Sequence, residues 1–533
     1  MVRVRWALLT GTLLLSLTAL GQETPPSSEL TALKREALAV FSRILTDGSA
    51  AERLSAVNSL VRNGDDSVVP LLIERLLADE APFVRRAAAV GLGHFRSQEA
   101  QRALRRAALS DEIASVRWDA ALSAQESDVI LALLSQRETL AAAALSLQES
   151  AGRLPGAIWH SVEVALLRAF PDRESWNVVE RAAMLKALAQ LGSLGAVDRL
   201  RVTLADTDED PFVRGAAAFA LGVLGVRNAV PELIAALAVD SEAIQVGAAG
   251  ALGLLGDPVA LEPLSNLVRT GRSPQARIAA AAALAPLGIQ AVSALAQALL
   301  SDPVPAVRQA ALRALRQIKG TAATHAVLTF LESKYLQECD PISCGGLALE
   351  TLKALAELGQ GQLALQVAQA MVAALRDVLP LLFIFAEGEL VQTFSIVGRR
   401  APELFDVLLR DHSPFVRALG IAAYASVYKA EARELLLKNL SDENALVRRV
   451  ALEGLSLWAT PDDTKVFALF VADSDPRTRL AALTALARVG DGQALEPLRR
   501  TLRAENPAVR LDGAGAALAF AIRWGRTSSP SVP

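Results

Sequence analysis

The residue types that most often carry out chemistry in proteins are few in this sequence and widely spaced. The chain has four histidines, His94, His160, His325 and His412, and none is followed by glutamate. The His-Glu-x-x-His motif of zinc enzymes is therefore absent, as are the Gly-x-Ser-x-Gly nucleophile elbow and the Gly-x-x-x-x-Gly-Lys phosphate loop. We expect no catalytic residue, no metal site and no bound cofactor. Carboxylates are plentiful, and two that meet in space could still form a catalytic pair, so an enzyme remains the alternative.

Two cysteines, Cys339 and Cys344, have four residues between them, including Pro341, and stand just before two glycines. This pattern predicts a disulfide that closes a turn. The N-terminal residues, described below, predict export, and an exported protein meets oxidising conditions. The alternatives are free thiols and a metal ion. Two thiolates with no nearby histidine fall short of the four ligands of a structural zinc site.

Acidic and basic residues recur as pairs in which an aspartate precedes an arginine by six residues. The pairs are Asp47/Arg53, Asp79/Arg85, Asp111/Arg117, Asp208/Arg214, Asp302/Arg308, Asp411/Arg417, Asp442/Arg448 and Asp473/Arg479. We interpret them as a structural ladder rather than a row of ligand sites. Each carboxylate can accept backbone N–H groups where the next helix begins, and each guanidinium can bond its own aspartate and that of the adjacent unit.

These pairs belong to a longer repeated frame, which indicates the elements that position them. The frame Asp, then Pro-x-Val-Arg-x-Ala-Ala, recurs around Arg85, Arg214 and Arg308, and most neighbouring units are 31–33 residues apart. Apolar or small residues follow a helical stripe at Val213, Ala216, Ala217, Ala220 and Leu221. Gly222 would end that helix.

A second amphipathic stretch precedes each arginine helix, as at 68–77, 230–237, 291–300 and 495–502. Each unit therefore reads as two helices, and about 15 units fill the chain, with irregular units near 125–175 and 335–405. The glycines Gly247, Gly250, Gly253 and Gly256 lie along one such Ala-rich helix. We interpret them as allowing close helix packing rather than nucleotide binding.

This frame resembles the HEAT-repeat family, most closely the bacterial HEAT-like units first described in phycobilin lyases. The resemblance covers nearly all of residues 30–520. It implies an all-α fold, a right-handed α-solenoid of stacked helix pairs with a concave inner face. It implies nothing firm about chemistry, because one fold serves many functions.

The first residues predict an export signal. Arg3 and Arg5 precede the uncharged apolar run 6–20, and small residues stand before a potential cleavage site at Gln22. The run is shorter than the roughly 20 residues of a membrane span, although an uncleaved anchor or a buried first helix remain alternatives. We therefore expect a signal peptide at 1–21, a linker at 22–29, the solenoid at 30–524 and a disordered tail at 525–533. The mature protein would be periplasmic or extracellular and have no integral membrane span.

Composition narrows the class of function. The chain is 52% hydrophobic but only 5% aromatic, and it carries 54 basic and 57 acidic residues. This charge balance argues against nucleic acid as a partner. We expect a non-enzymatic scaffold or adaptor of the cell envelope that binds a protein or peptide on its concave face, with a lyase-like or other catalytic HEAT protein as the alternative. The oligomeric state is left open.

Departures from the repeat are the candidate contacts for that partner. Trp118 follows Arg117 and lies off the Ala-Ala stripe, so it could face the groove. Phe383 and Phe385 lie in an aromatic-rich unit that lacks the arginine, and they could form an apolar contact patch. The alternative for the two phenylalanines is a rebuilt core helix.

Overall fold

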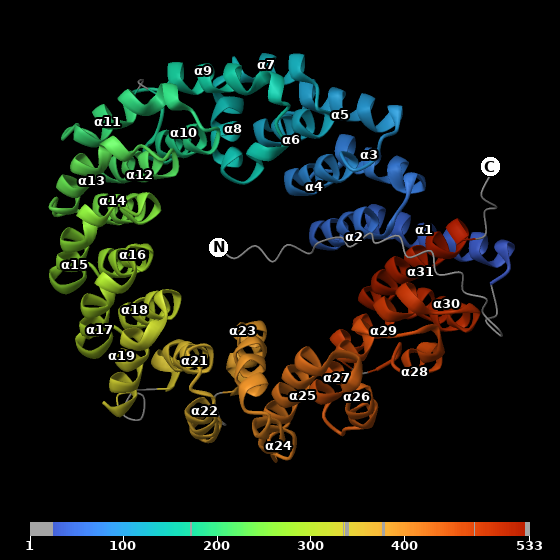
Figure 1. The fold of residues 1–533 in the computed structure, drawn as a ribbon. Coiled ribbons are helices and arrows are strands. Elements are labelled where there is room, and N and C mark those ends of the chain that lie inside the picture. The colour runs from blue at the N-terminus through green and yellow to red at the C-terminus, as the bar shows by residue number, and fades with distance from the viewer. Residues whose placement is uncertain are drawn as a thin grey trace, which may run out of the picture.

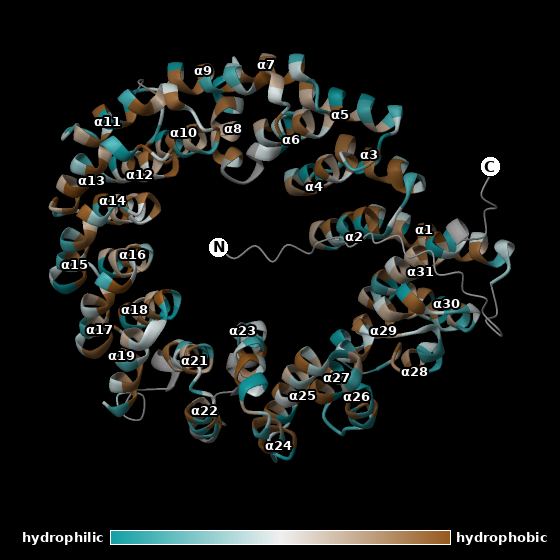
Figure 2. Cartoon of the chain, in the orientation of Figure 1, coloured by the Kyte–Doolittle hydropathy of each residue, from teal (hydrophilic) through white to brown (hydrophobic). Residues whose placement is uncertain are grey.

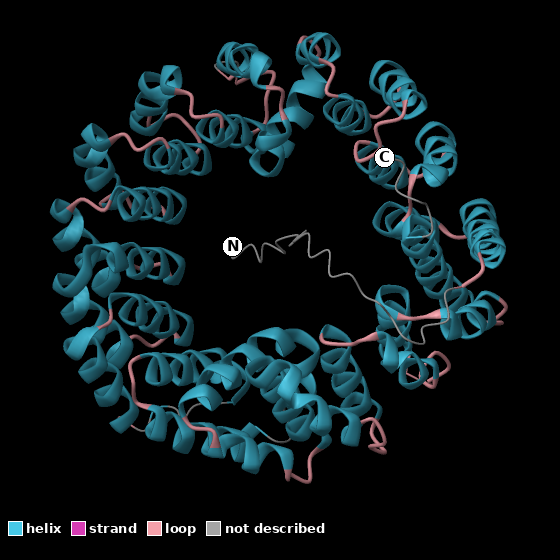
Figure 3. Ribbon diagram, turned by 45° about the vertical axis from the view of Figure 1, so that its right-hand side comes forward, coloured by secondary structure: helices cyan, strands magenta, loops and turns pink. Residues whose placement is uncertain are grey.

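The computed structural model describes residues 25–170, 173–333, 335, 341–375, 379–473 and 475–527. These residues form helices and connecting turns, with no strand among them. The helices are arranged in two concentric rows, one inner and one outer, that together form a ring (Figures 1 and 3). The predicted all-α solenoid is confirmed.

Each repeat contributes one outer and one inner helix, and fifteen such pairs lie in the described residues, from α1/α2 to α30/α31. The inner helices are α2 (Ala50–Asn63), α4 (Pro82–Leu92), α6 (Ala114–Ala124), α8 (Arg137–Ser150), α10 (Val178–Gln190), α12 (Pro211–Val223), α14 (Glu242–Leu255), α16 (Pro274–Leu284), α18 (Pro305–Ile318), α21 (Pro341–Glu357), α23 (Leu379–Arg400), α25 (Pro414–Tyr428), α27 (Ala445–Leu457), α29 (Pro476–Val489) and α31 (Pro507–Thr527). The outer helices are α1 (Ser27–Asp47), α3 (Val69–Ala78), α5 (Gln98–Ser110), α7 (Ser127–Leu134), α9 (Trp159–Ala169), α11 (Val197–Ala205), α13 (Val230–Leu237), α15 (Leu261–Thr270), α17 (Val292–Ser301), α19 (Gly320–Glu332), α22 (Gly361–Leu375), α24 (Glu403–Leu409), α26 (Arg433–Asn439), α28 (Thr464–Ala468) and α30 (Leu495–Leu502).

Helix α12 shows how the repeat frame specifies an inner helix. The Asp210 side chain caps it by accepting the Phe212 N–H, and Pro211 occupies the first turn, where its missing N–H is harmless. The predicted apolar stripe from Val213 to Leu221 is buried. Gly222, however, does not end the helix, which runs to Val223. A Cβ on Gly222 would lie 2.3 Å from the Ala251 Cα, so this glycine serves close packing instead.

Alanine and leucine make up most of a core that continues from one repeat to the next. Apolar residues recur in the helix pairs all around the ring (Figure 2). Each inner helix packs on its own outer helix and on the inner helices of the neighbouring repeats. The predicted one-dimensional stacking therefore accounts for how a chain of this length avoids a single oversized core.

The ends of the solenoid lie side by side, so the ring is closed (Figure 1). Helix α1 packs against α31, the last inner helix, more extensively than against its own partner α2. Helix α1 begins at Ser27, within the expected linker, and α31 extends to Thr527, past the expected end of the solenoid. The predicted signal peptide and residues 528–533 lie outside the described residues.

One segment, Pro274–Ser301, is long and apolar enough to pass a composition test for a membrane span. It consists of α16 and α17 joined by a turn in which Gly288 has a φ of 71°. Such a value breaks a continuous helix. The segment is therefore the inner helix of one repeat followed by the outer helix of the next.

Candidate functional site

The repeated Asp and Arg side chains form ion pairs between neighbouring repeats. Five arginines contact the aspartate of the following repeat at 2.7–3.1 Å: Arg53–Asp79, Arg85–Asp111, Arg277–Asp302, Arg417–Asp442 and Arg448–Asp473. The same arginines donate to backbone carbonyls in their own loops, as Arg85 Nη1 does to Asp79 O at 2.8 Å. An arginine thus reaches its own loop through a carbonyl oxygen and the next repeat through a carboxylate.

The carboxylate in each pair also accepts a backbone N–H in the loop that precedes the inner helix. Asp79 accepts the Ala81 N–H at 2.9 Å, and Asp302 accepts the Val304 N–H at 2.8 Å. Burial of the Asp79 carboxyl opposes its ionisation, but the hydrogen bonds from Arg53 and Ala81 outweigh burial and hold the pKa of Asp79 below its usual value. These features make the pairs part of the packing of the solenoid.

The ladder prediction at Asp208 is wrong, because the acidic residue that pairs there is the next one, Glu209. Asp208 is exposed, and the neighbouring Glu209 is buried and pairs with Arg181 at 2.7 Å. Arg214 donates to the backbone carbonyl of Leu204 rather than to an acidic side chain of the next repeat. The loop before α12, residues 206–210, is two residues longer than the loops before α4, α6, α16 and α18, which shifts the acidic side chain that reaches the preceding arginine.

Other predicted members differ in their partners. Arg308 stacks on the Tyr335 ring at 3.9 Å and donates to Asp302 O, and Arg117 donates to Asp111 O and Thr139 Oγ1. Asp47 is exposed at the end of α1. Asp411 accepts the Ser413 N–H, and Arg479 donates to the Asp473 carbonyl.

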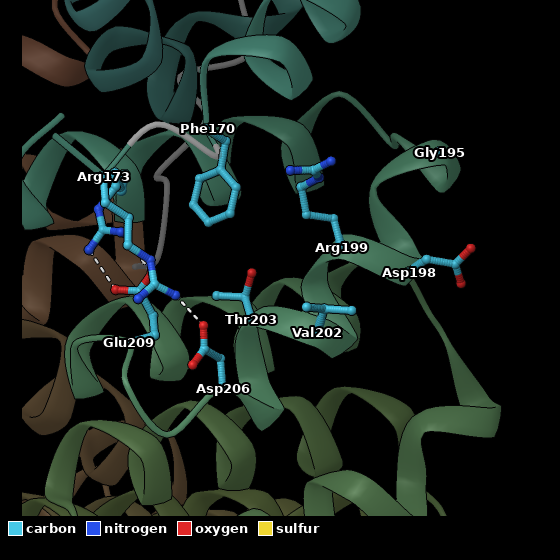
Figure 4. A pocket seen from close by; sticks show the side chains of 10 residues that line it. Phe170, Arg173, Gly195, Asp198, Arg199, Val202, Thr203, Asp206 and Glu209 are labelled. Carbon is cyan, nitrogen blue, oxygen red and sulfur yellow. Dashed lines mark hydrogen bonds and ion pairs between the residues drawn. The ribbon is translucent and has the colours of Figure 1, made fainter. Parts of the chain in front are cut away.

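A pocket of about 470 Å³ lies beside the Arg181–Glu209 pair (Figure 4). Arg173 and Arg181 both contact the Glu209 carboxylate, and Arg173 also pairs with Asp206. Arg199 lines the pocket but lies apart from this cluster. The acidic groups nearest the arginines, Asp206 and Glu209, are therefore engaged in ion pairs.

The histidines and the described acidic residues form no metal-binding cluster. All four histidines are exposed and far apart in the chain; the imidazole of His160 contacts Glu163 of the same helix. No group of three or more metal-ligating side chains occurs among the described residues.

Trp118 is a correction to the sequence prediction, because it does not face the groove. Its side chain is 1% exposed, and its Nε1 donates to Ser146 Oγ of α8 at 2.6 Å. The physical reason is that the position after the arginine faces the next inner helix. Gly215, at the same position of α12, lies against the backbone of α14. Trp118 therefore fills an interface between repeats.

The remaining predicted residues cannot be placed as contacts. Phe383 and Phe385 lie in α23 and Cys344 in α21, but their side chains, and Cys339 as a whole, are outside the described residues. The apolar contact patch and the disulfide stay predictions.

An apolar surface that the sequence prediction missed lies on α12, α14 and α16. Phe212, Phe219 and Leu254 are 46%, 38% and 58% exposed. They surround a hollow of about 760 Å³, here called the inner hollow, which is lined by Lys186, Phe212, Gly215, Ala216, Phe219, Glu242, Ala243, Val246, Gly247, Gly250, Gly253, Leu254, Gln275, Ala279, Ala282, Ala283 and Pro286. Since the outer helices cover the opposite side of these inner helices, the hollow faces the inside of the ring.

Glycine spacing explains why the surface is hollowed. A Cβ on Gly247 would lie 2.1 Å from the Gly215 carbonyl oxygen, so α12 and α14 touch through their backbones. A Cβ on Gly250 would lie 3.1 Å from the Phe219 ring, which rests on this glycine. The floor is thus made of backbone and small side chains, and Phe212 and Phe219 form its raised sides. Phe212 and Phe219 are seven residues apart, which places them on the same face of a helix. This spacing was the sequence signal for the exposed pair.

The charges around the inner hollow are sparse. The Lys186 ammonium lies 5.4 Å from the centre of the Phe212 ring, and Glu242 lies at the margin. Other inner helices carry charges that are paired among themselves. Arg449 of α27 bonds Glu387 of α23, and Glu350 of α21 pairs with arginines of α18. The inner hollow is therefore an apolar part of the inner surface with few charges of its own, whereas the inner sides of α18, α21, α23 and α27 carry ion pairs.

Comparison with known proteins identifies the repeat. The family model of HEAT repeats matches residues 38–125, 162–241, 201–285, 267–341 and 464–521, which together make up more than half of the chain. No curated protein matches the sequence significantly.

The chain is also similar to several solved structures. Yeast importin-beta (Kap95p) has a TM-score of 0.49 at 14% identity, with 92% of this chain and 81% of that chain covered. The karyopherin Kap121p bound to the SUMO protease Ulp1p has a TM-score of 0.40 at 13% identity, with 94% and 72% covered. Human deoxyhypusine hydroxylase in complex with glycerol has a TM-score of 0.23 at 19% identity, with 57% and 97% covered.

Proposed function

Because the chain belongs to the HEAT-repeat family, we propose that it is a non-enzymatic scaffold that binds a protein or peptide on the inner face of its ring, at the inner hollow. The observation that carries this proposal is the exposure of Phe212, Phe219 and Leu254 around a depression floored by glycines and alanines. Large aromatic side chains at the rim of an apolar depression are typical of the residues that dominate binding energy in protein interfaces. A partner segment that buries them would gain apolar contact without having to break an ion pair of the scaffold.

The hollow suits a segment of polypeptide better than a small polar molecule. Its lining is mostly apolar, and the described residues around it offer few charged groups, chiefly Lys186 and Glu242. A small polar substrate would need several convergent polar groups to fix its orientation. An apolar stripe on a helix or an extended peptide needs only shape and apolar area.

Site-specific photo-crosslinking tests the proposal directly. A photoreactive phenylalanine analogue replaces Phe219, and in a control chain it replaces Leu469, which is 79% exposed beside the outer helix α28. We expect a discrete protein or peptide adduct from position 219 and none from position 469. Equal adducts from both positions would count against the inner hollow.

A matched pair of variants then measures the contribution of the phenylalanines. Phe212→Ser with Phe219→Ser is expected to abolish co-purification of the crosslinked partner. Phe83→Ser is the control, because Phe83 holds the same repeat position as Phe212 and is 49% exposed, but it lies outside the hollow. Retention of the partner by the double variant would refute the site, provided that both chains give the melting curve of the wild type.

We also propose that this scaffold works outside the cytoplasm, in the cell envelope or beyond it. The support is the sequence pattern of Arg3 and Arg5 before the apolar run 6–20. N-terminal sequencing of the protein recovered from its producing cells tests this. A mature chain that begins at Gln22 would support export, and one that retains the arginines in a cytosolic fraction would contradict it.

A further inference from the structure

The point at which the ring closes differs in construction from the other interfaces between repeats. A ring made from a single chain has one interface that no peptide bond crosses, and here it is the contact of α1 and α2 with α30 and α31. We call this contact the seam. Consecutive repeats elsewhere stay linked by a loop if their packing loosens, so the ring can part only at the seam.

The seam is closed mainly by an apolar stripe on α1. Leu30, Leu33, Ala37 and Phe41 are buried, although α1 packs less on its own partner α2 than on α31. Helix α1 thus adds a further outer helix to the last repeat. A second contact joins α2 to α31, where a Cβ on Gly515 would lie 2.6 Å from Ser59 Oγ.

The polar contacts of the seam are weaker than those of the ladder. Arg510 donates to the carbonyl oxygens of Ala504 and Glu505 in its own loop, and no ion pair joins it to the exposed Asp47 in the described residues. Instead, Arg499 of α30 lies 3.5 Å from Glu29 and 3.6 Å from Glu36 of α1, with both carboxylates partly exposed. Exposed pairs at such distances contribute little to stability.

A cavity also remains where the seam meets the inside of the ring. It has a volume of about 620 Å³ and lies between α2, α29 and α31. Ser55, Asn58 and Asn63 line one side, and Asp512 and Arg488 line the other. Side chains around such a cavity lack partner atoms on one side. The closest interface in the middle of the ring, between α12 and α14, is packed backbone to backbone instead.

From this construction we propose that the ring opens and closes at the seam, with α1 as its latch. The closed ring is the ground state, because opening exposes the apolar stripe of α1. Opening leaves the ladder and the stacking of the other repeats intact, since none of their contacts crosses the seam. This inference concerns the chain alone and does not depend on what binds in the inner hollow.

A reversible covalent lock tests the proposal. A Cβ built on Gly515 lies 4.0 Å from Ser59 Cβ, within the Cβ–Cβ range of about 3.5–4.5 Å for disulfides. Ser59→Cys with Gly515→Cys is made in a chain that also carries Cys339→Ser and Cys344→Ser. Hydrogen exchange is then followed in α1, α31, α14 and α16 with the new pair oxidised and reduced.

We expect oxidation to slow exchange in α1 and α31 several-fold and to leave α14 and α16 unchanged. The same exchange with the pair oxidised and reduced, or equally fast opening in α14 and α16, would overturn the proposal. Arg499→Glu supplies a second test without cysteines, because it places a negative charge against Glu29 and Glu36. It should speed exchange in α1, and Arg500→Glu, on an exposed neighbour in the same helix, should not.

Discussion

The Arg53–Asp79 pair allows a sharp test of the ladder, because it is buried on both sides. The Asp79 side chain is fully buried and that of Arg53 is 9% exposed, with Nε and Nη2 at 2.8 and 2.9 Å from the two carboxylate oxygens. Asp79→Ala leaves the guanidinium with Gly48 O and with Glu80, whose side chain is 86% exposed. We expect the free energy of unfolding to fall by about 3–5 kcal/mol, as when one partner of a buried pair is removed.

A double variant tests whether the loss in Asp79→Ala comes from the unpaired charge of Arg53. Arg53→Met with Asp79→Ala removes both charges and keeps an apolar stem in the space of the arginine. Because the loss in Asp79→Ala comes largely from an uncompensated buried charge, the double variant should be less destabilised than the sum of the single variants, by about 1–3 kcal/mol. Asp79→Asn is the control for the hydrogen bond to Ala81, since an amide oxygen can still accept that N–H.

Urea unfolding followed by circular dichroism measures these differences, and hydrogen exchange in α2 and α4 locates them, because long repeat arrays can depart from two-state unfolding. A loss below about 1 kcal/mol for Asp79→Ala, which is typical of an exposed pair, would refute the argument. Strict additivity in the double variant would also refute it. The pair of Asp442 and Arg417 is more exposed, at 14% for Asp442 and 20% for Arg417. Asp442→Ala should therefore lower the free energy of unfolding by less, about 1–3 kcal/mol.

Three further predictions concern other features of the chain. The pKa of Asp79 is lowered in the folded state, so the contribution of its ionised carboxylate to stability should be complete above the ordinary carboxyl pKa of about 4 and be lost as the pH falls through the folded-state pKa. The urea midpoints of the wild type and Asp79→Asn should therefore converge in acid, and a constant gap between them would contradict this. Gly247→Ala should lower stability by about 1–3 kcal/mol through overpacking, because its Cβ would meet the Gly215 carbonyl. The control Gly388→Ala, whose Cβ meets no atom within 4 Å, should be neutral or raise stability by up to about 1 kcal/mol. Thermal melts that rank the two variants the other way would refute the packing argument. Finally, Cys339 and Cys344 should resist alkylation until the protein is reduced, as read by intact mass, and labelling of the unreduced chain would exclude the disulfide.

Local features of the fold were predictable because they depend on neighbours in the sequence. The stretch 230–237 is the helix α13, and the residues of the α12 stripe are buried as their spacing indicates. The sequence also showed several of the side chains that pair between repeats, among them Arg53 and Asp79, but it did not show that Arg308 stacks on Tyr335 instead. It could not show that Glu209 replaces Asp208, because that choice depends on how the longer loop 206–210 places the side chain opposite Arg181.

The candidate site was less predictable, because it depends on contacts between repeats. Trp118 looked exposed when only its own helix was considered, but it lies against α8 of the next repeat. Phe212 and Phe219 lie off the predicted apolar stripe of α12 and were not among the predicted contacts. They are exposed because the glycines of α14 bring its backbone so close that no side chain covers them.

Closure of the ring follows from the same small residues, acting over many repeats. In a curved stack, the inner helices must lie closer together than the outer ones. Gly215 against Gly247, and Gly253 against Ala283, bring consecutive inner helices within backbone contact, whereas the outer helices α13, α15 and α17 pack on one another less extensively. Each repeat therefore adds a small rotation in the same sense. Fourteen such rotations relate the first repeat to the last and bring α31 to α1, so the close contacts at small residues of the inner row contribute to the curvature, and the number of repeats determines that the curve closes.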